Sequence, residues 1–374
     1  MHIMIVTACM SGGGAERVIS RLLADFTKRG VRCTLVLMHK KEIEYRIPEQ
    51  TKVIEIGVLS GSSAADKLKK YARVRAIAKE EKPDLILSMP EEIGIYVALA
   101  MMGSSVPVVV SERNNPWVMP YKKITRFLRR VAYPHTKGLI FQTEMAASFF
   151  PKSQRKKGIV LPNPLDTENI PLPHEGERDK RVVAAGRLET QKNFPLLIHA
   201  FAQFCRTHPD YELVIYGEGS ERPCLEDLSV QEIEGESWSL PGRSSCLAEE
   251  MKSASMFVLS SDYEGMPNAL IEAMALGIPS ISTDCPSGGS AELIEDGVNG
   301  LLTPVGDKEA LCLAMCRIAE DGELARTLSE NGVKIKERLC CERVCALWLD
   351  YLTSVADKSS KKHKKNKKTK EDKE

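Results

Sequence analysis

The sequence lacks the features that would place it in a membrane-spanning or fibrous class. Its 374 residues contain no run of about 18 apolar residues, so no segment is expected to span a membrane. The 43% hydrophobic and 28% charged residues are ordinary values for a globular chain of about two domains. This composition excludes a wholly disordered, a collagen-like or a small disulfide-stapled protein.

The sequence also lacks signs of export. Its first ten residues, MHIMIVTACM, have no basic region and no small-residue cleavage site, so we interpret them as a strand and not as a signal peptide. The chain has 11 cysteines, an odd number, and they are scattered along the sequence, which favours reduced thiols over disulfides. A cytoplasmic protein is predicted, and a peripheral position on the inner face of the cell membrane is left open.

The small net charge of +1 hides a segregation of charge along the chain. Residues 1–165 carry +13, residues 166–353 carry −17 and residues 354–374 carry +5. Such an asymmetry points to anionic partners. The alternative is that two domains of opposite charge simply face each other or the solvent.

Strand and helix patterns alternate along both halves of the chain. Strands are predicted over residues 1–7, 31–38, 52–56, 85–89, 106–111, 138–143, 181–185, 211–216, 256–259 and 278–282. Helices are predicted over 15–28, 64–79, 92–102, 194–206 and 268–276. The pattern therefore predicts an α/β fold, with two doubly wound Rossmann-like domains joined near 165–180. Ligands of such sheets bind beyond the carboxyl ends of the strands, so the cleft between two such domains is the natural site.

A glycine loop, SGGGAER (11–17), follows the first strand and opens the first helix. Backbone N–H groups and the helix dipole suit a phosphate there. The spacing is neither G-x-G-x-x-G nor a P-loop, and the second strand ends in His39-Lys40-Lys41 without a ribose-binding acid. A nicotinamide enzyme is therefore disfavoured, although an NADP form stays open. A tight turn that packs helix against strand is the structural alternative.

The most informative segment is residues 261–302. Glu264 and Glu272 stand eight residues apart, and Gly265 and Pro267 shape the loop between a strand and a helix for which Asn268 is a good N-cap. Glu264 is placed to accept hydrogen bonds from sugar hydroxyls, and Glu272 to bind the two hydroxyls of a ribose. The alternative is that both glutamates merely favour a helix N-terminus.

Two further loops follow strands of the same sheet. GRLETQKN (186–193) carries Arg187 and Lys192, two cations suited to the phosphates of a nucleotide sugar. YGEG (216–219) is a glycine turn. Because all these loops come at carboxyl ends of strands of one sheet, they are expected to converge.

Together these residues resemble the retaining glycosyltransferases of family four, which have the GT-B fold. The matching pieces span residues 12 to 302 in family order: GGGAER, LPNPLD, GRLETQKN, YGEG, EGMPNALIEAMALGIPSI, GGSAELI and GVNGLL. The resemblance implies metal-independent transfer from a nucleotide-activated sugar with retention of anomeric configuration. No cofactor is expected, and the sequence contains no Asp-x-Asp pair to hold a metal with the diphosphate.

The resemblance also implies roles for single residues. Arg187 and Lys192 match the diphosphate-binding pair, Glu264 the carboxylate that contacts the donor sugar, and Glu272 the one that contacts the ribose. The donor-binding loops then include Gly217, Gly219, Gly265, Met266, Pro267, Asn268 and Ala269. The first-domain loop over the diphosphate and acceptor matches Gly12, Gly13 and Gly14.

One departure from the family concerns a histidine that many relatives carry after the fourth strand of the first domain. This region here contains Glu112 and Arg113, and the next histidine, His135, does not fit the pattern. Glu112 and Arg113 are therefore held as acceptor-side residues. The alternative is a salt bridge at the edge of a strand.

The resemblance assigns four parts to the chain. Residues 1–165 form an acceptor-binding Rossmann-like domain, and 166–345 form a domain that binds the nucleotide sugar. Residues 346–356 form a helix that crosses back to the first domain. Residues 357–374 form a lysine-rich tail that is expected to be disordered.

The acceptor is expected to meet the basic first half. Residues 121–133, YKKITRFLRRVAY, form a basic amphipathic helix that suits an anionic membrane surface, and the tail adds further lysines. The alternative is a surface helix whose apolar stripe lies in the core. No nucleic acid is expected, because no aromatic residues interleave with the tail lysines.

The sequence therefore predicts transfer of a hexose or N-acetylhexosamine from a nucleotide sugar, with UDP expected as the nucleotide. The acceptor would be a membrane-associated, polyprenyl-diphosphate-linked glycan in cell-surface polysaccharide assembly. A GT-B nucleotide-sugar epimerase and a non-catalytic binding module with this fold are the alternatives. A phosphorylase is disfavoured, because no signature of a pyridoxal-phosphate lysine is present.

Overall fold

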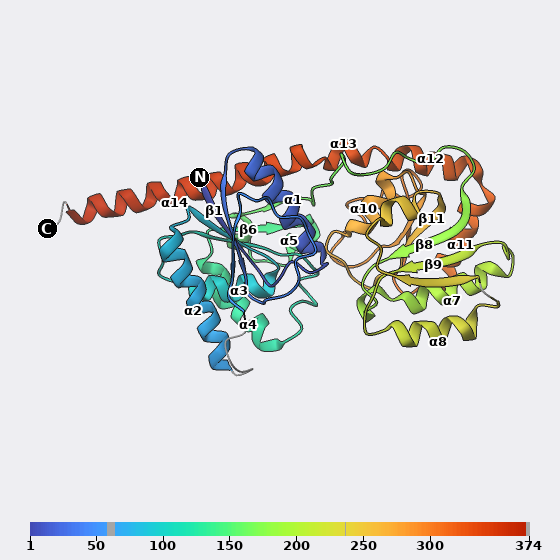
Figure 1. Cartoon of the computed structure of the whole chain (residues 1–374), viewed down its shortest axis with the longest axis horizontal. Helices are drawn as coiled ribbons and strands as arrows, with labels where there is room; N and C mark the ends of the chain where they lie inside the picture. The colour runs from blue at the N-terminus through green and yellow to red at the C-terminus, as the bar shows by residue number, and fades with distance from the viewer. Residues whose placement is uncertain (58–63, 236, 372–374) are drawn as a thin grey trace. The chain divides into compact units, whose positions relative to one another are not determined.

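The computed structural model describes residues 1–57, 64–235 and 237–371, and the chain divides into two compact units (Figure 1). Unit 1 comprises residues 1–164 and 341–374, and unit 2 comprises residues 165–340. Each unit contains one parallel β-sheet with helices on both faces. A two-domain α/β fold with doubly wound sheets is confirmed.

Unit 1 is built on seven strands in the order β3-β2-β1-β4-β5-β6-β7. The strands are β1 (His2–Thr7), β2 (Arg32–Leu37), β3 (Lys52–Glu55), β4 (Leu85–Ser88), β5 (Val108–Ser111), β6 (Gly138–Phe141) and β7 (Gly158–Val160). The helices are α1 (Gly14–Lys28), α2 (Ala64–Glu81), α3 (Glu91–Ala100), α4 (Lys123–Ala132), η1 (Tyr133–His135), α5 (Glu144–Ser148), α6 (Lys152–Arg155) and α14 (Cys341–Glu371).

Successive side chains of the unit 1 strands enter two separate cores, as the two-residue period of a strand requires. Ile3 and Ile5 pack with α1 and α14, whereas Met4 and Val6 pack with α2 and α3. The sheet is therefore apolar on both faces, which explains why its strands are near-continuous apolar runs in the sequence.

Unit 2 is built on six strands in the order β10-β9-β8-β11-β12-β13. The strands are β8 (Asp179–Ala185), β9 (Glu212–Tyr216), β10 (Trp238–Gly242), β11 (Ala254–Leu259), β12 (Ser280–Thr283) and β13 (Leu301–Thr303). The helices are η2 (Thr190–Lys192), α7 (Phe194–Cys205), α8 (Arg222–Glu232), α9 (Leu247–Met251), α10 (Asn268–Ala275), α11 (Lys308–Glu320), α12 (Gly322–Gly332) and α13 (Ile335–Leu339).

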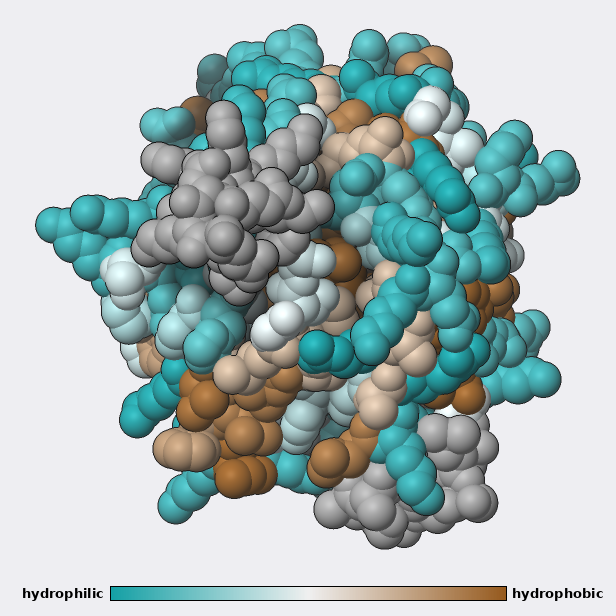
Figure 2. Space-filling view, turned by 90° about the vertical axis from the view of Figure 1, so that its left-hand side faces the viewer, coloured by the Kyte–Doolittle hydropathy of each residue, from teal (hydrophilic) through white to brown (hydrophobic). Residues whose placement is uncertain are grey.

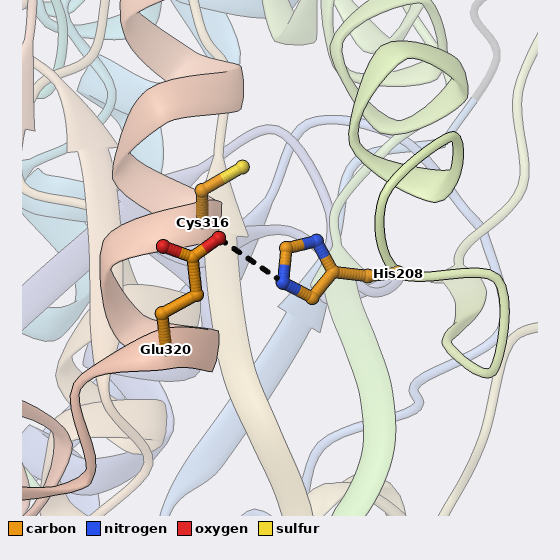
Figure 3. A group of neighbouring side chains, drawn as sticks. All are labelled: His208, Cys316 and Glu320. Carbon is orange, nitrogen blue, oxygen red and sulfur yellow. Dashed lines mark ion pairs between the residues drawn. The ribbon is translucent and has the colours of Figure 1, made fainter.

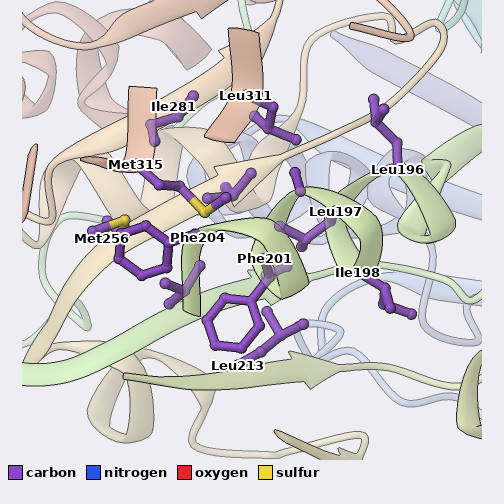
Figure 4. Close-up of a cluster of buried hydrophobic side chains, with 14 of the residues drawn as sticks. Leu196, Leu197, Ile198, Phe201, Phe204, Leu213, Met256, Ile281, Leu311 and Met315 are labelled. Carbon is purple, nitrogen blue, oxygen red and sulfur yellow. The ribbon is translucent and has the colours of Figure 1, made fainter. Parts of the chain in front are cut away.

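One face of this sheet is covered by α7, α8 and α11. Phe201 and Phe204 of α7 and Met315 of α11 pack over Met256 of β11 and Ile281 of β12 (Figure 4). The other face is covered by α9, α10 and α13. These two cores fix the sheet, and the sheet in turn fixes the loops at the ends of its strands.

The last helix returns to unit 1. It begins at Cys341, earlier than the expected 346, because Val344 and Cys345 are already buried in the unit 1 core. Trp348 is fully buried, and its indole N–H donates to the Pro162 carbonyl at 3.1 Å. The boundary between the units falls at Leu165, one residue before the expected 166.

The lysine-rich tail differs from expectation. Residues 357–371 are helical and continue α14, whereas disorder was expected for 357–374. Lysine and glutamate are good helix formers, and a helix already held by its buried segment needs no new nucleation. Residues 372–374 lie outside the described residues.

The face of the protein in Figure 2 is mostly hydrophilic, with a group of apolar side chains exposed at its lower left.

Candidate functional site

The topology of unit 2 selects one edge of its sheet as a binding site. The strand order reverses between β8 and β11, and a crevice forms at the carboxyl ends of the strands at such a switch point. The loop 186–193 follows β8, and the loop 260–267 follows β11. Both of these loops carry residues that the sequence singled out.

Lys192 and Glu264 meet across this switch point. Lys192 Nζ lies 2.5 Å from Glu264 Oε1, and their side chains are only 14% and 9% exposed. The Ser261 hydroxyl donates to the same Oε1 at 2.7 Å, and the Gln191 amide reaches Oε2 at 3.4 Å. An ammonium group has three N–H donors, and Glu264 occupies one of them. The pair therefore presents a cation for an anionic group beside a carboxylate that can accept hydroxyl hydrogen bonds.

Polar contacts that sequence patterns do not predict hold the two loops together. Asn193 adopts φ 43° at the start of α7, and its amide donates to Asp262 Oδ1 at 2.7 Å. The Ser260 hydroxyl donates to the Lys192 carbonyl at 2.9 Å, and Gln191 Nε2 donates to the Tyr263 carbonyl at 2.8 Å. One sequence signal could have identified Asn193: it stands directly before a helix that starts with Phe-Pro, and asparagine tolerates this left-handed backbone.

Close backbone contacts bring further strand ends into the same site. A Cβ at Gly217 would stand 1.8 Å from the Gly186 carbonyl oxygen, and one at Gly289 would stand 1.6 Å from the Gly265 carbonyl oxygen. A Cβ at Gly186 would itself come within 2.9 Å of the Lys192 side chain. The loops after β8, β9, β11 and β12 therefore touch where only glycine fits, which supports the expected convergence.

The other candidate residues of unit 2 are placed as follows. Arg187 is half-exposed, and its guanidinium lies 2.9 Å from Glu189 Oε2. Glu272 is buried at the fifth position of α10. The expectation that Asn268 caps α10 is wrong, because Pro267 holds the N-cap position with no side-chain cap bond and Asn268 is the first helical residue. The remaining loop positions are Gly219 after β9 and Met266 and Ala269 around the start of α10.

The glycine loop of unit 1 opens α1 as expected. Gly13 is the N-cap of α1, Gly14 is its first residue, and Gly12 has φ 77°. The Tyr45 hydroxyl donates to the Gly13 carbonyl at 3.0 Å, and the Arg17 guanidinium lies 6.0 Å from the Tyr45 ring. The loop thus lies at the carboxyl end of β1, at the switch point between β1 and β4.

Glu112 and Arg113 lie at the end of β5 in a polar network inside unit 1. The Tyr133 hydroxyl donates to Glu112 Oε1, and Arg129 Nη1 lies 3.6 Å from Oε2. Arg113 donates to Asn163 Oδ1 at 2.5 Å, and burial lowers the pKa of Arg113 to about 10. The cation beside Glu112 is thus Arg129 of α4, whereas Arg113 bonds to Asn163, so these contacts do not match the salt bridge expected for Glu112 and Arg113, and their acceptor-side role stays a prediction.

The pH dependence of stability should reveal the buried Glu112. Burial raises the pKa of Glu112 to about 8, with the Arg129 charge opposing this and the charge of Glu91 adding to it. The folded state then keeps a proton that the unfolded chain loses above its ordinary pKa near 4.5. Stability from this group is therefore present below about pH 4.5 and is lost as pH rises to about 8, by up to about 1.4 kcal/mol per pH unit.

Urea unfolding of the wild type and of Glu112→Gln at pH 5, 6, 7 and 8 measures this effect. The free energy of unfolding should fall more steeply with pH for the wild type, because the glutamine is neutral throughout. The exposed Glu49→Gln is the matched control and should follow the wild type. Equal slopes for wild type and Glu112→Gln would contradict a protonated Glu112.

A second group of polar side chains lies in unit 2. His208 Nε2 lies 3.4 Å from Glu320 Oε1, and Cys316 precedes Glu320 by one turn of α11 (Figure 3). Their ligand atoms lie within 4.8 Å of one another, and histidine, cysteine and carboxylate are the ligand types of zinc. His208 precedes β9, so this group lies at the amino ends of the strands and is separate from the Lys192–Glu264 site.

None of the helices in the described part of the chain has the length and apolar character needed to cross a bilayer.

Both halves of the chain match known family models. Residues 12–169 match the model described as Glycosyltransferase Family 4, and residues 167–335 match the one described as Glycosyl transferases group 1. The two matches meet at the boundary between the structural units.

Two relatives of similar length come from Campylobacter jejuni. One is N-acetylgalactosamine-N,N'-diacetylbacillosaminyl-diphospho-undecaprenol 4-alpha-N-acetylgalactosaminyltransferase, 30% identical over 88% of this chain and 93% of that protein. The other is GalNAc-alpha-(1->4)-GalNAc-alpha-(1->3)-diNAcBac-PP-undecaprenol alpha-1,4-N-acetyl-D-galactosaminyltransferase, 26% identical over 95% of this chain and 99% of that protein.

Solved structures show the same fold. The Anabaena protein HepE in complex with UDP and glucose has a TM-score of 0.79 at 20% identity, over 94% of this chain and 99% of that one. Sucrose-phosphate synthase from Thermosynechococcus elongatus has a TM-score of 0.82 at 18% identity, over 95% of this chain and 98% of that one. The chain therefore belongs to the glycosyltransferases, and its two units form a GT-B fold.

Proposed function

We propose that the protein transfers a hexose or an N-acetylhexosamine from a nucleotide sugar, most simply a UDP-sugar, to a glycan carried on a polyprenyl diphosphate. The observation that carries the proposal is the largely buried Lys192–Glu264 pair at the switch point of unit 2. The names of the two Campylobacter relatives support the lipid-linked acceptor, and the HepE complex supports UDP. The process would be assembly of a bacterial cell-surface polysaccharide.

The proposed roles follow from charge and position. Lys192 and Arg187 would neutralise the diphosphate and hold it as it departs, which replaces the charge compensation that a metal gives elsewhere. Glu264 would accept hydrogen bonds from the donor sugar, and Glu272 would bind the ribose. Gly12, Gly13 and Gly14 would offer backbone N–H groups at the start of α1. Retention of configuration and independence from metal and cofactors are parts of the same proposal.

Thermal unfolding with UDP-, GDP- and ADP-sugars tests the donor. A ligand at 100 times its dissociation constant stabilises the folded state by about 2.7 kcal/mol, so one nucleotide class should raise the melting temperature by several degrees. A chelator in every sample tests independence from metal. No shift with any nucleotide sugar would contradict the proposal.

Proton NMR of the reaction tests the chemistry. With donor and a lipid-linked acceptor, the new glycosidic bond should have the anomeric configuration of the donor. An inverted product would contradict retention. Isomerisation of the donor sugar without acceptor would identify an epimerase instead.

A further inference from the structure

Helix α4 exposes its apolar face and buries its polar one. The apolar patch comprises Trp117, Tyr121, Ile124, Phe127 and Val131, whose exposed fractions are 45, 62, 60, 59 and 39%. The last three lie on one face of α4, whereas its buried residues are Thr125, Arg129 and Ala132. A surface helix of a globular protein normally does the reverse. The alternative of an apolar stripe in the core is therefore wrong for this helix.

Two arginines hold α4 in this orientation. Arg126 donates to the carbonyls of Pro120, at 2.7 Å, and of Val118. Arg129 donates to the carbonyls of Met119 at 3.0 Å and Pro116 at 2.9 Å. Rotating the helix to bury the apolar patch would break these charged hydrogen bonds.

The buried arginine is anchored further into unit 1. The Arg129 guanidinium lies 4.7 Å from the Phe149 ring and 3.6 Å from Glu112 Oε2. Removing a buried charge from such partners is strongly unfavourable. The exposed apolar patch is therefore fixed by the fold and is not an accident of a loosely packed helix.

The charges of the segment that carries the patch are of one sign. Lys122, Lys123 and Arg130 are exposed beside it, and the sequence contains no acidic residue from 113 to 143. Tryptophan and tyrosine are enriched where proteins meet the headgroup region of a bilayer, and lysine and arginine are attracted to anionic lipids. An apolar patch with a cationic rim fits an anionic lipid surface better than it fits an acidic protein.

We propose that the apolar patch, with Lys122, Lys123 and Arg130, inserts into the interface of an anionic lipid bilayer. The patch would then place the carboxyl edge of the unit 1 sheet beside the membrane, because the loop 112–122 joins that edge to α4. That this brings a lipid-linked acceptor to the enzyme rests on the proposed function. Binding to the lipid surface itself does not.

Flotation of the full chain with vesicles tests the surface. Vesicles of phosphatidylcholine with 30% phosphatidylglycerol should carry the protein, and pure phosphatidylcholine should carry far less. The double variant I124S/F127S should lower partitioning at least ten-fold. K122E/K123E should lower it by a similar factor, at roughly five-fold or more for each reversed charge. Wild-type failure to float with anionic vesicles would overturn the proposal.

Matched controls separate the patch from general surface effects. V230S/L313S removes two apolar side chains of unit 2 that are as exposed as those of the patch, and K40E/K41E reverses two exposed lysines elsewhere in unit 1. Both should float like the wild type. If the patch variants also float like the wild type, the proposal is wrong.

Two further measurements distinguish membrane binding by the patch from two alternatives, which are membrane binding by the tail and a protein interface at the patch. A chain that ends at Ala356 should keep its preference for anionic vesicles, and complete loss would assign binding to the tail and overturn the proposal. Sedimentation velocity should show the same oligomeric state for I124S/F127S as for the wild type. A change from dimer to monomer, with vesicle binding intact, would make the patch a protein interface and overturn the proposal.

A failure of the proposed function can be distinguished from a failure of the lipid-surface proposal. The patch variants should retain hydrolysis of the nucleotide sugar, because the patch lies in unit 1 and the Lys192–Glu264 site lies in unit 2. Intact vesicle binding without any reaction of a nucleotide sugar would reject the proposed function and leave the lipid surface standing.

Discussion

Replacing Lys192 by methionine should reduce sugar transfer by roughly 10²–10³-fold, the usual effect of removing one group that stabilises charge developing on a leaving group. Lys192 is a partly buried cation at the switch point of unit 2, and its ammonium is fixed 2.5 Å from Glu264. Methionine keeps most of the side-chain volume beside Gly186 and removes the charge together with its N–H donors. The measurement is kcat/KM for the nucleotide sugar at fixed acceptor concentration.

The same variant also unpairs a buried carboxylate, so lost stability must be separated from lost chemistry. Breaking a fully buried ion pair from one side costs about 3–5 kcal/mol. The cost should be smaller here, because Lys192 is only partly buried and Glu264 keeps its hydrogen bonds with Ser261 and Gln191. Adding Glu264→Gln to Lys192→Met should restore much of the stability, because the unpaired charge is then gone. Activity should stay low in the double variant, since neither group can act on the substrate.

The matched control is Lys180→Met. Lys180 forms an ion pair with Asp210 in which both side chains are about half-exposed, and such solvent-screened surface pairs add little to stability. This variant should keep wild-type stability and activity. If Lys192→Met transfers sugar at the wild-type rate, Lys192 does not stabilise the departing diphosphate, and the proposed site has lost its main support.

The sequence predicts the location of this site well because parallel sheets leave little freedom. Strand–helix alternation implies that the loops after successive strands meet at one sheet edge, so Lys192 and Glu264 could be assigned to one site although 72 residues separate them. The partners that fix the pair could not be assigned. Asn193, Ser260 and Asp262 are ordinary loop residues until the register of β8 and β11 brings their atoms together.

Other differences between the predicted and the observed elements also have local causes. Strand β10 was not predicted, because it ends in Pro241-Gly242, two residues that weaken a strand pattern. They are tolerated there because β10 is at the edge of the sheet. The periodicity of α4 shows which residues share a face, but only the arginine bonds to the 116–120 carbonyls decide which face points inward. Sequence patterns thus specify faces and edges, whereas long-range polar contacts decide their orientation.

The second large effect concerns the glycines that let the loops of unit 2 touch. Gly217→Ala should destabilise unit 2 by about 3 kcal/mol or more, at the upper end of single substitutions. Its φ is +146°, and the new Cβ would stand 1.8 Å from the Gly186 carbonyl oxygen, which belongs to backbone and cannot swing aside. If the loops shift to relieve the contact, Lys192 moves with them, and a 1 Å displacement at a reacting centre costs about 10²-fold in rate.

Three other glycines separate the two causes, strained backbone and close contact. Gly289 has the close contact without a left-handed φ, Gly297 has φ +74° with nothing within 4 Å, and Gly322 has neither. If close contact dominates, Gly289→Ala should approach Gly217→Ala in both stability and activity. Gly297→Ala should cost only about 1–2 kcal/mol from backbone strain, and Gly322→Ala should be neutral or slightly stabilising.

Urea unfolding and kcat/KM of the four variants measure the two quantities independently. Loss of activity in Gly217→Ala and Gly289→Ala, with Gly297→Ala active, would support a site assembled by contact between loop backbones. If Gly297→Ala lost as much activity as Gly289→Ala, backbone strain anywhere in unit 2 would suffice, and the close contacts would have no special part in placing Lys192. The Lys192–Glu264 geometry would then depend on the stability of the unit as a whole, and the convergence of its loops would explain the shape of the site but not its activity.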